Sequence, residues 1–324
     1  MCDRREPSIR ERPVRAPERA GSVAVIVAAK DAAATIARAV ASALAQPDAA
    51  EVVVVDDGST DETARRARDA DDGSGRLTVV SQAQAGPAAA RNLALSLSRS
   101  PWICPLDADD FLNPGRLGRL LAQAQGCDLV ADDLLLVAEG AEDAAPKPLI
   151  GEQLDLPFVL DFRTFVDANV SRPGLARREF GFLKPLIRRG FLEAAELAYD
   201  PALRLGEDFI LYATALAKGA RFRVVQACGY VSVQRPGSLS HNHTIADLKA
   251  LQRASARLAG LPGLGAAEIA AARRHHRHVT AKVDLREVLE AKQTGGLLGA
   301  LAAVAMRAAS APYILRQGLG GQRA

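Results

Sequence analysis

From residue 23 onward, short apolar runs alternate with amphipathic stretches. Residues 23–28 and 51–55 are apolar or β-branched runs that predict strands, and apolar positions between them recur at helical spacing over residues 36–44. The alternation continues with strands predicted at 77–81, 102–106, 128–137 and 222–225 and helices predicted at 88–98 and 113–125. Because strands that alternate with helices form a parallel sheet joined by crossover helices, the pattern predicts an α/β fold.

The pattern divides the chain into three parts. Residues 1–20 are rich in Arg, Glu and Pro and contain no apolar core, so we expect a disordered lead-in and no secretory signal. Residues 21–243 carry the strand and helix alternation and are expected to form one domain, whereas residues 244–324 predict a C-terminal helical extension. Since no stretch reaches the roughly 18 consecutive apolar residues of a membrane span, we expect the chain not to cross a membrane by itself.

Composition narrows the function classes. The chain has 324 residues, of which 48% are hydrophobic and 24% charged, as is usual for a folded globular protein. Its net charge of +3 and aromatic content of 4% are too low for the basic field and stacking surfaces of a nucleic-acid-binding protein, so we expect no nucleic acid partner. The scattered cysteines predict reduced thiols in a cytoplasmic protein; they are Cys2, Cys104, Cys127 and Cys228.

The first candidate for chemistry is the acidic end of the second predicted strand. The segment VVVVDDGSTD, residues 52–61, runs from a buried strand directly into paired acids and a turn. In open parallel sheets, ligands bind at the carboxyl ends of strands, where a carboxylate can accept hydrogen bonds from a base or ribose. Acids there are also typical of a helix cap. Ser59 and Glu62 have the spacing of a capping box, which predicts that a helix follows.

A second acidic strand end follows at residues 102–110. Asp107, Asp109 and Asp110 place three carboxylates within four residues, and these repel one another unless a cation lies among them. Oxygen ligands of this kind favour Mg²⁺ or Mn²⁺, held with the help of substrate phosphates. An acidic turn that caps a helix is the alternative, but two acidic strand ends in one sheet favour a ligand site.

Four segments in order resemble family 2 glycosyltransferases of the GT-A fold: VAVIVAAKDAAATIARAVASAL, VVVVDDGSTDET, GPAAARN and LDADDFLNPGRL. The resemblance covers about residues 21 to 240. It implies a Rossmann-like, mostly parallel sheet flanked by helices and a nucleotide-diphosphate sugar as donor. GPAAARN, GFLKPLIRR and RPGSLSHNHT are also similar to bacterial exopolysaccharide glycosyltransferases of the succinoglycan pathway, which build a lipid-linked repeat unit.

The resemblance implies a role for individual residues on the donor side. Asp57 would bind the nucleotide base, Ala28 and Lys30 would line the same pocket, and Arg91 would approach the nucleotide. The stretch Asp107-Ala108-Asp109 would form the Asp-x-Asp motif that holds the ribose and a diphosphate-bound Mn²⁺ or Mg²⁺, with Asp110 sharing the metal.

Later segments extend the resemblance to the catalytic base. Glu207 and Asp208 match the family's Glu-Asp segment, in which the aspartate is the general base, although acids are also typical of a helix's first turn. Arg235 and either His241 or His243 would contact the diphosphate or the metal, unless they are solvated loop residues.

Basic residues outside these segments have a plainer interpretation. Lys184 and Arg188 could meet a charged acceptor, but we interpret them as a solvated basic face.

The C-terminal region offers basic and apolar surfaces. His275, His276 and His278 lie on one predicted helix among three arginines, whose charge disfavours a metal ion, so we expect a solvated or membrane-facing basic surface. The apolar stretch 297–314 predicts either a helix packed on the catalytic domain or an interfacial anchor.

Together these features predict a metal-dependent, inverting glycosyltransferase that moves a hexose, with UDP-glucose as the expected donor, to a hydroxyl of a lipid-linked glycan. The sequence lacks the Gln-x-x-Arg-Trp motif of processive family members, which favours transfer of a single sugar. We expect it in the cytoplasm, in peripheral contact with the inner face of the membrane.

Other classes fit less well. A dehydrogenase would need a Gly-x-Gly-x-x-Gly turn after the first strand, and a nucleotidyltransferase a glycine-rich phosphate loop; neither is present near the N-terminus. A non-catalytic protein that binds nucleotide sugars or glycans on the same fold is the main alternative. The acids Asp107, Asp109 and Asp208 disfavour it, because a binder needs no positioned base.

Overall fold

The protein is built on an eight-stranded, mostly parallel sheet in the order β3-β2-β1-β4-β10-β6-β11-β9. The computed structural model describes residues 23–141, 145–151, 156–171, 178–235 and 243–319, so the predicted lead-in at 1–20 lies outside it. The strands are β1 (Val23–Ala29), β2 (Ala49–Asp56), β3 (Leu77–Ser81), β4 (Trp102–Asp107), β6 (Leu129–Asp132), β9 (Phe158–Leu160), β10 (Leu186–Arg188) and β11 (Phe222–Val225). Strands β1 to β4 pair in parallel, and β10 pairs antiparallel with both β4 and β6. The α/β prediction is confirmed.

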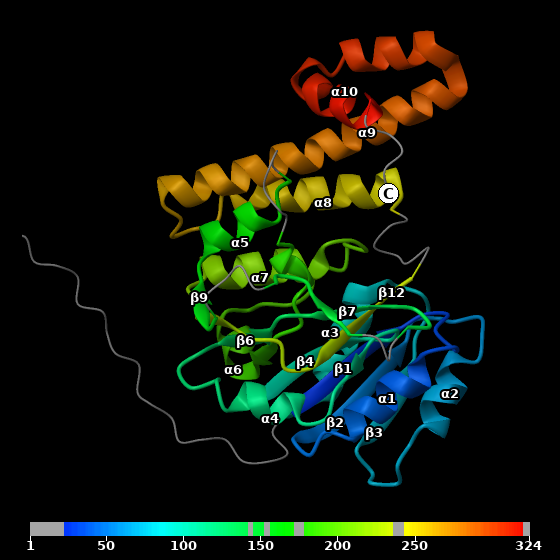
Figure 1. Ribbon diagram of the computed structural model, residues 1–324, viewed down its shortest axis with the longest axis vertical. Coiled ribbons are helices and arrows are strands. Elements are labelled where there is room, and N and C mark those ends of the chain that lie inside the picture. The colour runs from blue at the N-terminus through cyan, green and yellow to red at the C-terminus, as the bar shows by residue number, and fades with distance from the viewer. Residues whose placement is uncertain (1–22, 142–144, 152–155, 172–177, 236–242, 320–324) are drawn as a thin grey trace, which may run out of the picture.

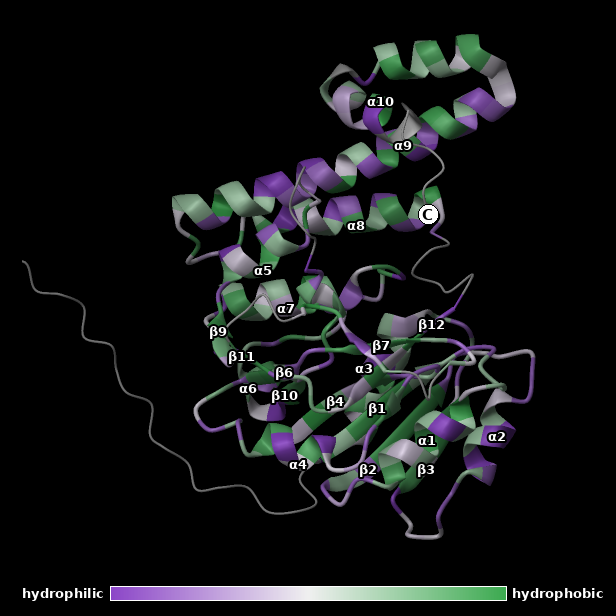
Figure 2. Ribbon diagram, in the orientation of Figure 1, coloured by the Kyte–Doolittle hydropathy of each residue, from purple (hydrophilic) through white to green (hydrophobic). Residues whose placement is uncertain are grey.

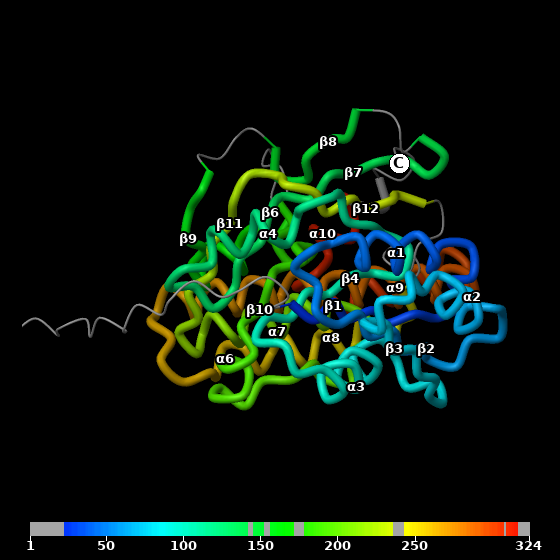
Figure 3. The backbone as a smooth tube through the Cα atoms, turned by 90° about the horizontal axis from the view of Figure 1, so that it is seen from below, coloured from blue at the N-terminus to red at the C-terminus, as the bar shows by residue number. Residues whose placement is uncertain are grey.

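Helices cover both faces of this sheet. They are α1 (Ile36–Leu44), α2 (Thr63–Asp69), α3 (Pro87–Leu97), α4 (Arg116–Leu121) and α6 (Arg189–Ala194), with α1 and α3 on opposite faces (Figure 3). The predicted capping box at the start of α2 is wrong. The Ser59 hydroxyl instead accepts a hydrogen bond from the backbone N–H of Asp31 at 2.9 Å, and α2 begins at Thr63 without a side-chain cap.

A smaller four-stranded sheet stands beside the large one, in the order β5-β12-β7-β8. Its strands are β5 (Phe111–Leu112), β7 (Leu135–Ala138), β8 (Lys147–Pro148) and β12 (Tyr230–Gln234). The extended segment predicted at 128–137 is therefore two strands that enter different sheets: β6 pairs with β10 and β11, whereas β7 pairs with β12 and β8.

A layer of helices lies over the second half of the sheet (Figure 1). It consists of α5 (Phe162–Ala168), the short 3₁₀ turn η1 (Phe180–Phe182), α7 (Glu207–Ala217), α8 (Ile245–Leu258) and the long α9 (Ala266–Ala305). Thr244 begins α8 with a capping box that it forms with Asp247. The prediction of a helical C-terminal region is confirmed.

The histidines of α9 are packed inside this layer. The His275 ring stacks on Phe209 of α7 with ring centroids 4.2 Å apart, and its Nδ1 lies 2.7 Å from the Ser255 hydroxyl. His278 is also buried and meets the edge of Tyr313. The expected solvated or membrane-facing surface is therefore wrong for both rings, because one face of α9 lies against α8 and α7.

The chain ends in a helical hairpin at the far end of α9 (Figure 1). Gly296 has φ 61°, outside the helical range, and after it the chain runs back, through η2 (Ala308–Ser310), into α10 (Ala311–Leu319). Val288, Ala303 and Ile314 form a small buried cluster, and Arg307 pairs with Glu287 across the hairpin.

The arm of this hairpin that follows Gly296 is mostly hydrophobic (Figure 2). Leu297, Leu298, Leu301 and Met306 are exposed by 74%, 81%, 65% and 83%. Within the described parts of the chain, none of the helices combines the length and the hydropathy that crossing a membrane would require.

Candidate active site

The two acidic strand ends lie at the same edge of the sheet, on either side of β1. In the register of the sheet, Ala28 of β1 pairs with Val55 of β2 on one side and with Asp107 of β4 on the other. Asp57 follows β2 directly, and its N–H donates to the Ala29 carbonyl at 2.8 Å. Ala28 thus lies between the two strand ends.

Asp57 is buried and holds the loop that leads into α3. Its Oδ1 accepts hydrogen bonds from the Gln82 side chain and the Ala85 N–H, both at 2.7 Å, and its Oδ2 accepts from the Gly86 N–H at 2.8 Å. The Lys30 ammonium donates to the Gly58 carbonyl at 2.9 Å nearby. A contact between Asp57 and a nucleotide base therefore requires that one of these bonds be exchanged or a lone pair shared.

Asp107 at the end of β4 is held by two cations from distant parts of the chain. Its Oδ1 accepts from the Arg91 guanidinium of α3 at 2.8 Å, and its Oδ2 lies 2.8 Å from the Lys184 ammonium. Burial alone would raise the pKa of Asp107, but the charges of Lys184 and Arg91 bring it down to about 2. The carboxylate is thus ionised at any physiological pH.

The first turn of α7 brings two more acids to the same point. Arg91 also donates to Glu207, and the Lys184 ammonium lies 2.7 Å from Oδ2 of Asp208. Burial opposes the charge of Arg91, yet the carboxylates of Asp208, Glu207 and Asp107 raise its pKa well above the usual value. Two buried cations and three carboxylates thus alternate in one cluster.

The start of α7 explains how Asp208 reaches this cluster. Gly206 precedes the helix with φ +72°, a left-handed conformation, and a Cβ there would lie 2.9 Å from Leu251 of α8. The left-handed backbone favours glycine, and a larger residue there would also have to displace the end of the Leu251 side chain. Asp208 is 6% exposed, and its Oδ1, unlike its Oδ2, is a buried atom without a hydrogen-bond partner in the part of the chain that the structure describes.

The other two acids of the β4 turn differ from each other. Asp110 is buried: its Oδ2 accepts from the Tyr230 hydroxyl and its Oδ1 from the Val233 N–H, both at 2.9 Å. Burial and the charges of Asp107 and Asp109 raise its pKa to about 8. Burial and Asp107 also raise the pKa of Asp109.

The expected metal can be tested against this turn. Crowded carboxylates with raised pKa values are relieved by a bound cation. In the residues that the structure describes, no three Asp, Glu, His or Cys side chains gather into a metal site of their own. The carboxylates of Asp107 and Asp109 fit Mg²⁺ or Mn²⁺ as part of a site that substrate phosphates complete. For Asp107 to bind the metal, it would have to exchange its contact with Arg91 or with Lys184.

Of the residues expected to contact the diphosphate, Arg235, His241 and His243, the structure places Arg235 next to the acidic turn. The Arg235 guanidinium lies 3.4 Å from the Asp109 carbonyl and 3.2 Å from the Glu139 carboxylate, so it borders the acidic turn. His241 lies outside the described residues. His243 is half-buried just before α8.

The interpretation of Lys184 as part of a solvated basic face is wrong, because its side chain is buried between two carboxylates. Its neighbours offer the signal that could have revealed this: Leu183, Leu186 and Ile187 are all buried, so the lysine stands in an apolar run. Arg188 is also not freely solvated, because it pairs with the buried carboxylate of Asp128.

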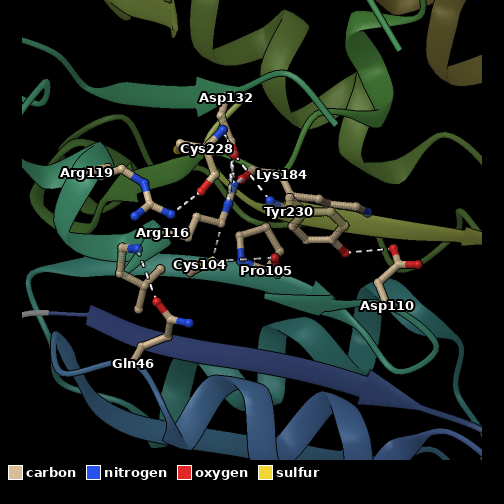
Figure 4. Close-up of polar contacts among 11 residues, drawn as sticks. Gln46, Cys104, Pro105, Asp110, Arg116, Arg119, Asp132, Lys184, Cys228 and Tyr230 are labelled. Atoms are coloured by element: carbon tan, nitrogen blue, oxygen red, sulfur yellow. Dashed lines mark hydrogen bonds and ion pairs between the residues drawn. The ribbon is translucent and has the colours of Figure 1, made fainter. Parts of the chain in front are cut away.

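A buried ionic pair, Arg116 with Asp132, lies next to Lys184 (Figure 4). Arg116 and Asp132 are both fully buried and 2.6 Å apart, and Arg116 also donates to the Lys184 carbonyl at 2.6 Å. Its guanidinium lies 5.1 Å from the Tyr230 ring centroid, and the Tyr230 hydroxyl accepts a hydrogen bond from the Asp107 N–H at 3.1 Å. Sequence reasoning missed this support because Arg116 and Asp132 are 16 positions apart and nothing in the sequence pairs them.

The fold and the acidic strand ends define a glycosyltransferase of the GT-A type, and comparisons with known proteins agree. A family profile described as Glycosyl transferase family 2 matches residues 24–167. The chain is 49% identical to the succinoglycan biosynthesis protein ExoU of Rhizobium meliloti strain 1021 over 294 residues, 90% of this chain and 85% of that protein. It is 40% identical to the succinoglycan biosynthesis protein ExoO of the same strain over 230 residues, 67% of this chain and 62% of that protein.

Solved structures share the fold. TarS 1-349 of S. aureus, in complex with UDP-GlcNAc, matches with a TM-score of 0.60 at 18% identity over 87% of this chain and 79% of that one. The mannosyltransferase PcManGT from Pyrobaculum calidifontis, in complex with GDP-Man and Mn²⁺, matches with a TM-score of 0.55 at 19% identity over 94% and 81%. The chain belongs to glycosyltransferase family 2. It is therefore an enzyme, and the alternative of a non-catalytic binding protein is set aside.

Proposed function

We propose that this enzyme transfers a hexose from UDP-glucose to a hydroxyl of a lipid-linked exopolysaccharide repeat unit, with inversion at the anomeric carbon. The similarity to ExoU and ExoO, which are named for succinoglycan biosynthesis, supports the pathway. The nucleotide sugars bound by TarS and PcManGT support a donor of this class.

The observation that carries the proposal is the position of Asp208. Its Oδ2 is held by Lys184, which also contacts Asp107 at the end of β4, while its Oδ1 is buried and has no hydrogen-bond partner among the described residues. An acceptor hydroxyl is a poor nucleophile and must lose its proton as it attacks. We assign that proton to Oδ1 of Asp208. The hydroxyl oxygen forms a bond to the anomeric carbon from one face, while the bond from that carbon to the diphosphate oxygen breaks on the other.

On the donor side, we propose that Asp107 and Asp109 hold Mn²⁺ or Mg²⁺ and that Arg235 borders the diphosphate. When bound, such a metal offsets the negative charge that develops on the departing diphosphate. For Asp110 to share the metal, it would have to release one of its two hydrogen bonds to β12, and His241 remains a candidate ligand on sequence grounds alone. Ala28, Lys30, Asp57 and Arg91 would line the nucleotide pocket.

Replacement of Asp208 by Asn tests the reaction. The change keeps the shape of the side chain and removes the base, so turnover should fall by roughly 10² or more, while donor affinity measured by calorimetry changes little. Asp161→Asn is a matched control, because Asp161 caps α5 through the Thr164 N–H and asparagine caps equally well. Near-normal turnover in Asp208→Asn, or a product that keeps the donor's anomeric configuration, would contradict the proposal.

We also propose that the enzyme works in the cytoplasm, in peripheral contact with the membrane that carries its acceptor. The support is the exposed apolar side of the C-terminal hairpin, formed by Leu297, Leu298, Leu301 and Met306. Lys292 and Arg316 are exposed on the same hairpin. Apolar residues flanked by basic ones are typical of segments that lie in a membrane interface.

A further inference from the structure

One lysine joins the donor side of the site to the acceptor side. The Lys184 ammonium lies 2.8 Å from Oδ2 of Asp107 at the end of β4 and 2.7 Å from Oδ2 of Asp208 in α7. The lysine is 5% exposed. Because both contacts are short and buried, this one ammonium sets the separation of two carboxylates from different layers of the fold.

The backbone that carries this lysine is itself fixed. The Lys184 carbonyl accepts a hydrogen bond from Arg116, whose guanidinium forms a fully buried ionic pair with Asp132 (Figure 4). Leu183 and Leu186 on either side are fully buried. The lysine side chain therefore extends from a rigid segment of backbone, and its ammonium has little freedom to follow either carboxylate if that carboxylate moves.

Lys184 makes the two oxygens of Asp208 different. A free carboxylate has equivalent oxygens, but here Oδ2 is bound by the ammonium, and Oδ1 has no hydrogen-bond partner within the described ranges. Arg91 contributes less to Asp208, because its nearest nitrogen is 3.9 Å from Oδ2 and its short contacts go to Asp107 and Glu207.

We propose that Lys184 is a positioning residue, which holds Asp208 in register with the donor-binding end of β4 and leaves Oδ1 as the oxygen that faces the acceptor. This role rests on the proposed function of Asp208 as the base. Without the ammonium, the Asp208 carboxylate is free to rotate and to turn toward Arg91.

The first test compares Lys184→Met with Lys184→Arg. A misplaced base costs up to about 10²-fold in rate, so Lys184→Met should lower kcat by about 10- to 100-fold. The donor Kd, measured by calorimetry, should change by less than about threefold, and Lys184→Arg should recover part of the lost kcat. Lys218→Met, at the exposed end of α7, is the matched control and should behave as the unmodified enzyme. Thermal unfolding checks that each variant is folded, and Lys184→Gln replaces the methionine variant if that variant does not fold.

A double-mutant cycle separates positioning from a general structural role. If Lys184 acts through Asp208, the combined Lys184→Met and Asp208→Asn variant should be no slower than Asp208→Asn alone. Three results would contradict the positioning role without affecting the assignment of Asp208 as the base. They are losses in kcat that multiply in the double variant, near-normal kcat in a folded Lys184→Met variant, and a donor Kd that is weakened by as large a factor as kcat is lowered. Unchanged turnover in the Asp208→Asn variant would contradict the assignment of Asp208 as the base, and the positioning role of Lys184 with it.

Discussion

The ends of β2 and β4 carry similar acids on either side of β1, yet these acids have different hydrogen-bond partners. Asp57 accepts three hydrogen bonds from uncharged donors, all within the loop 82–86. Asp107 is held by two cations, Arg91 and Lys184, from α3 and from the segment before β10. Neutral donors from one loop fix a local structure. Cations from distant elements form a cluster in which ion pairs can change partners when a charged ligand binds. A reaction centre requires such exchange, because charge develops and moves there during the reaction.

The largest effect that this comparison predicts lies at the end of β4. Chelation by EDTA should abolish sugar transfer, and Mn²⁺ or Mg²⁺ should restore it, because the departing diphosphate needs a Lewis acid. Asp109→Ala should lower turnover by at least about 10²-fold, since electrostatic stabilisation of this kind contributes several kcal/mol. Asp69→Ala is the control, because its ion pair with Arg65 is on the surface. Full activity in exhaustively chelated enzyme would contradict the proposed metal.

Substitution of Asp57 at the end of β2 should mainly lower the stability of the fold. In Asp57→Asn, one of the two side-chain positions becomes an amide donor, which cannot satisfy both the Ala85 and the Gly86 N–H groups. We expect the free energy of unfolding to fall by about 1–3 kcal/mol, the cost of an unpaired buried group. The donor KM should rise as the loop loosens, and kcat should change less than in Asp109→Ala. Urea unfolding and steady-state kinetics measure the two effects, and a turnover loss as large as that of Asp109→Ala would erase the contrast between the strand ends.

The smallest effect on turnover is expected at the C-terminal hairpin, whose apolar side, unlike either strand end, is open to solvent. Replacing Leu298 and Leu301 by Glu removes about 1–2 kcal/mol of apolar burial each from a membrane contact. Partition into anionic liposomes, measured by sedimentation, should fall by roughly tenfold or more, with turnover on a soluble acceptor analogue unchanged. Leu97→Glu is the control, because Leu97 is also an exposed apolar residue but lies outside the hairpin. This variant should partition into the liposomes as the unmodified enzyme does. Equal partition of all three proteins would assign the hairpin a purely structural role.

Much of the fold could be predicted from local pattern. The strands at 77–81 and 222–225 have the predicted bounds, and α1 covers the predicted stretch 36–44. Apolar periodicity reports which side of an element is buried, and burial is what forms these elements. The same reasoning failed for residues 128–137, because an apolar run does not say which sheet receives it, and it failed for His275, because a polar ring can be buried against a neighbouring helix.

The candidate site divides in the same way. The sequence by itself determined the α/β fold, the two acidic strand ends, the family resemblance and Asp208 as the candidate base, because strand ends and helix starts leave their signals within a few neighbouring residues. Only the tertiary structure decided that Lys184 is buried between Asp107 and Asp208 and Arg91 between Asp107 and Glu207. It also decided that, among the described residues, one oxygen of Asp208 has no partner. Attraction between charges depends on their separation in space and on the burial around them, and positions 91, 107, 184 and 208 meet only after the sheet and the helices that cover it have packed.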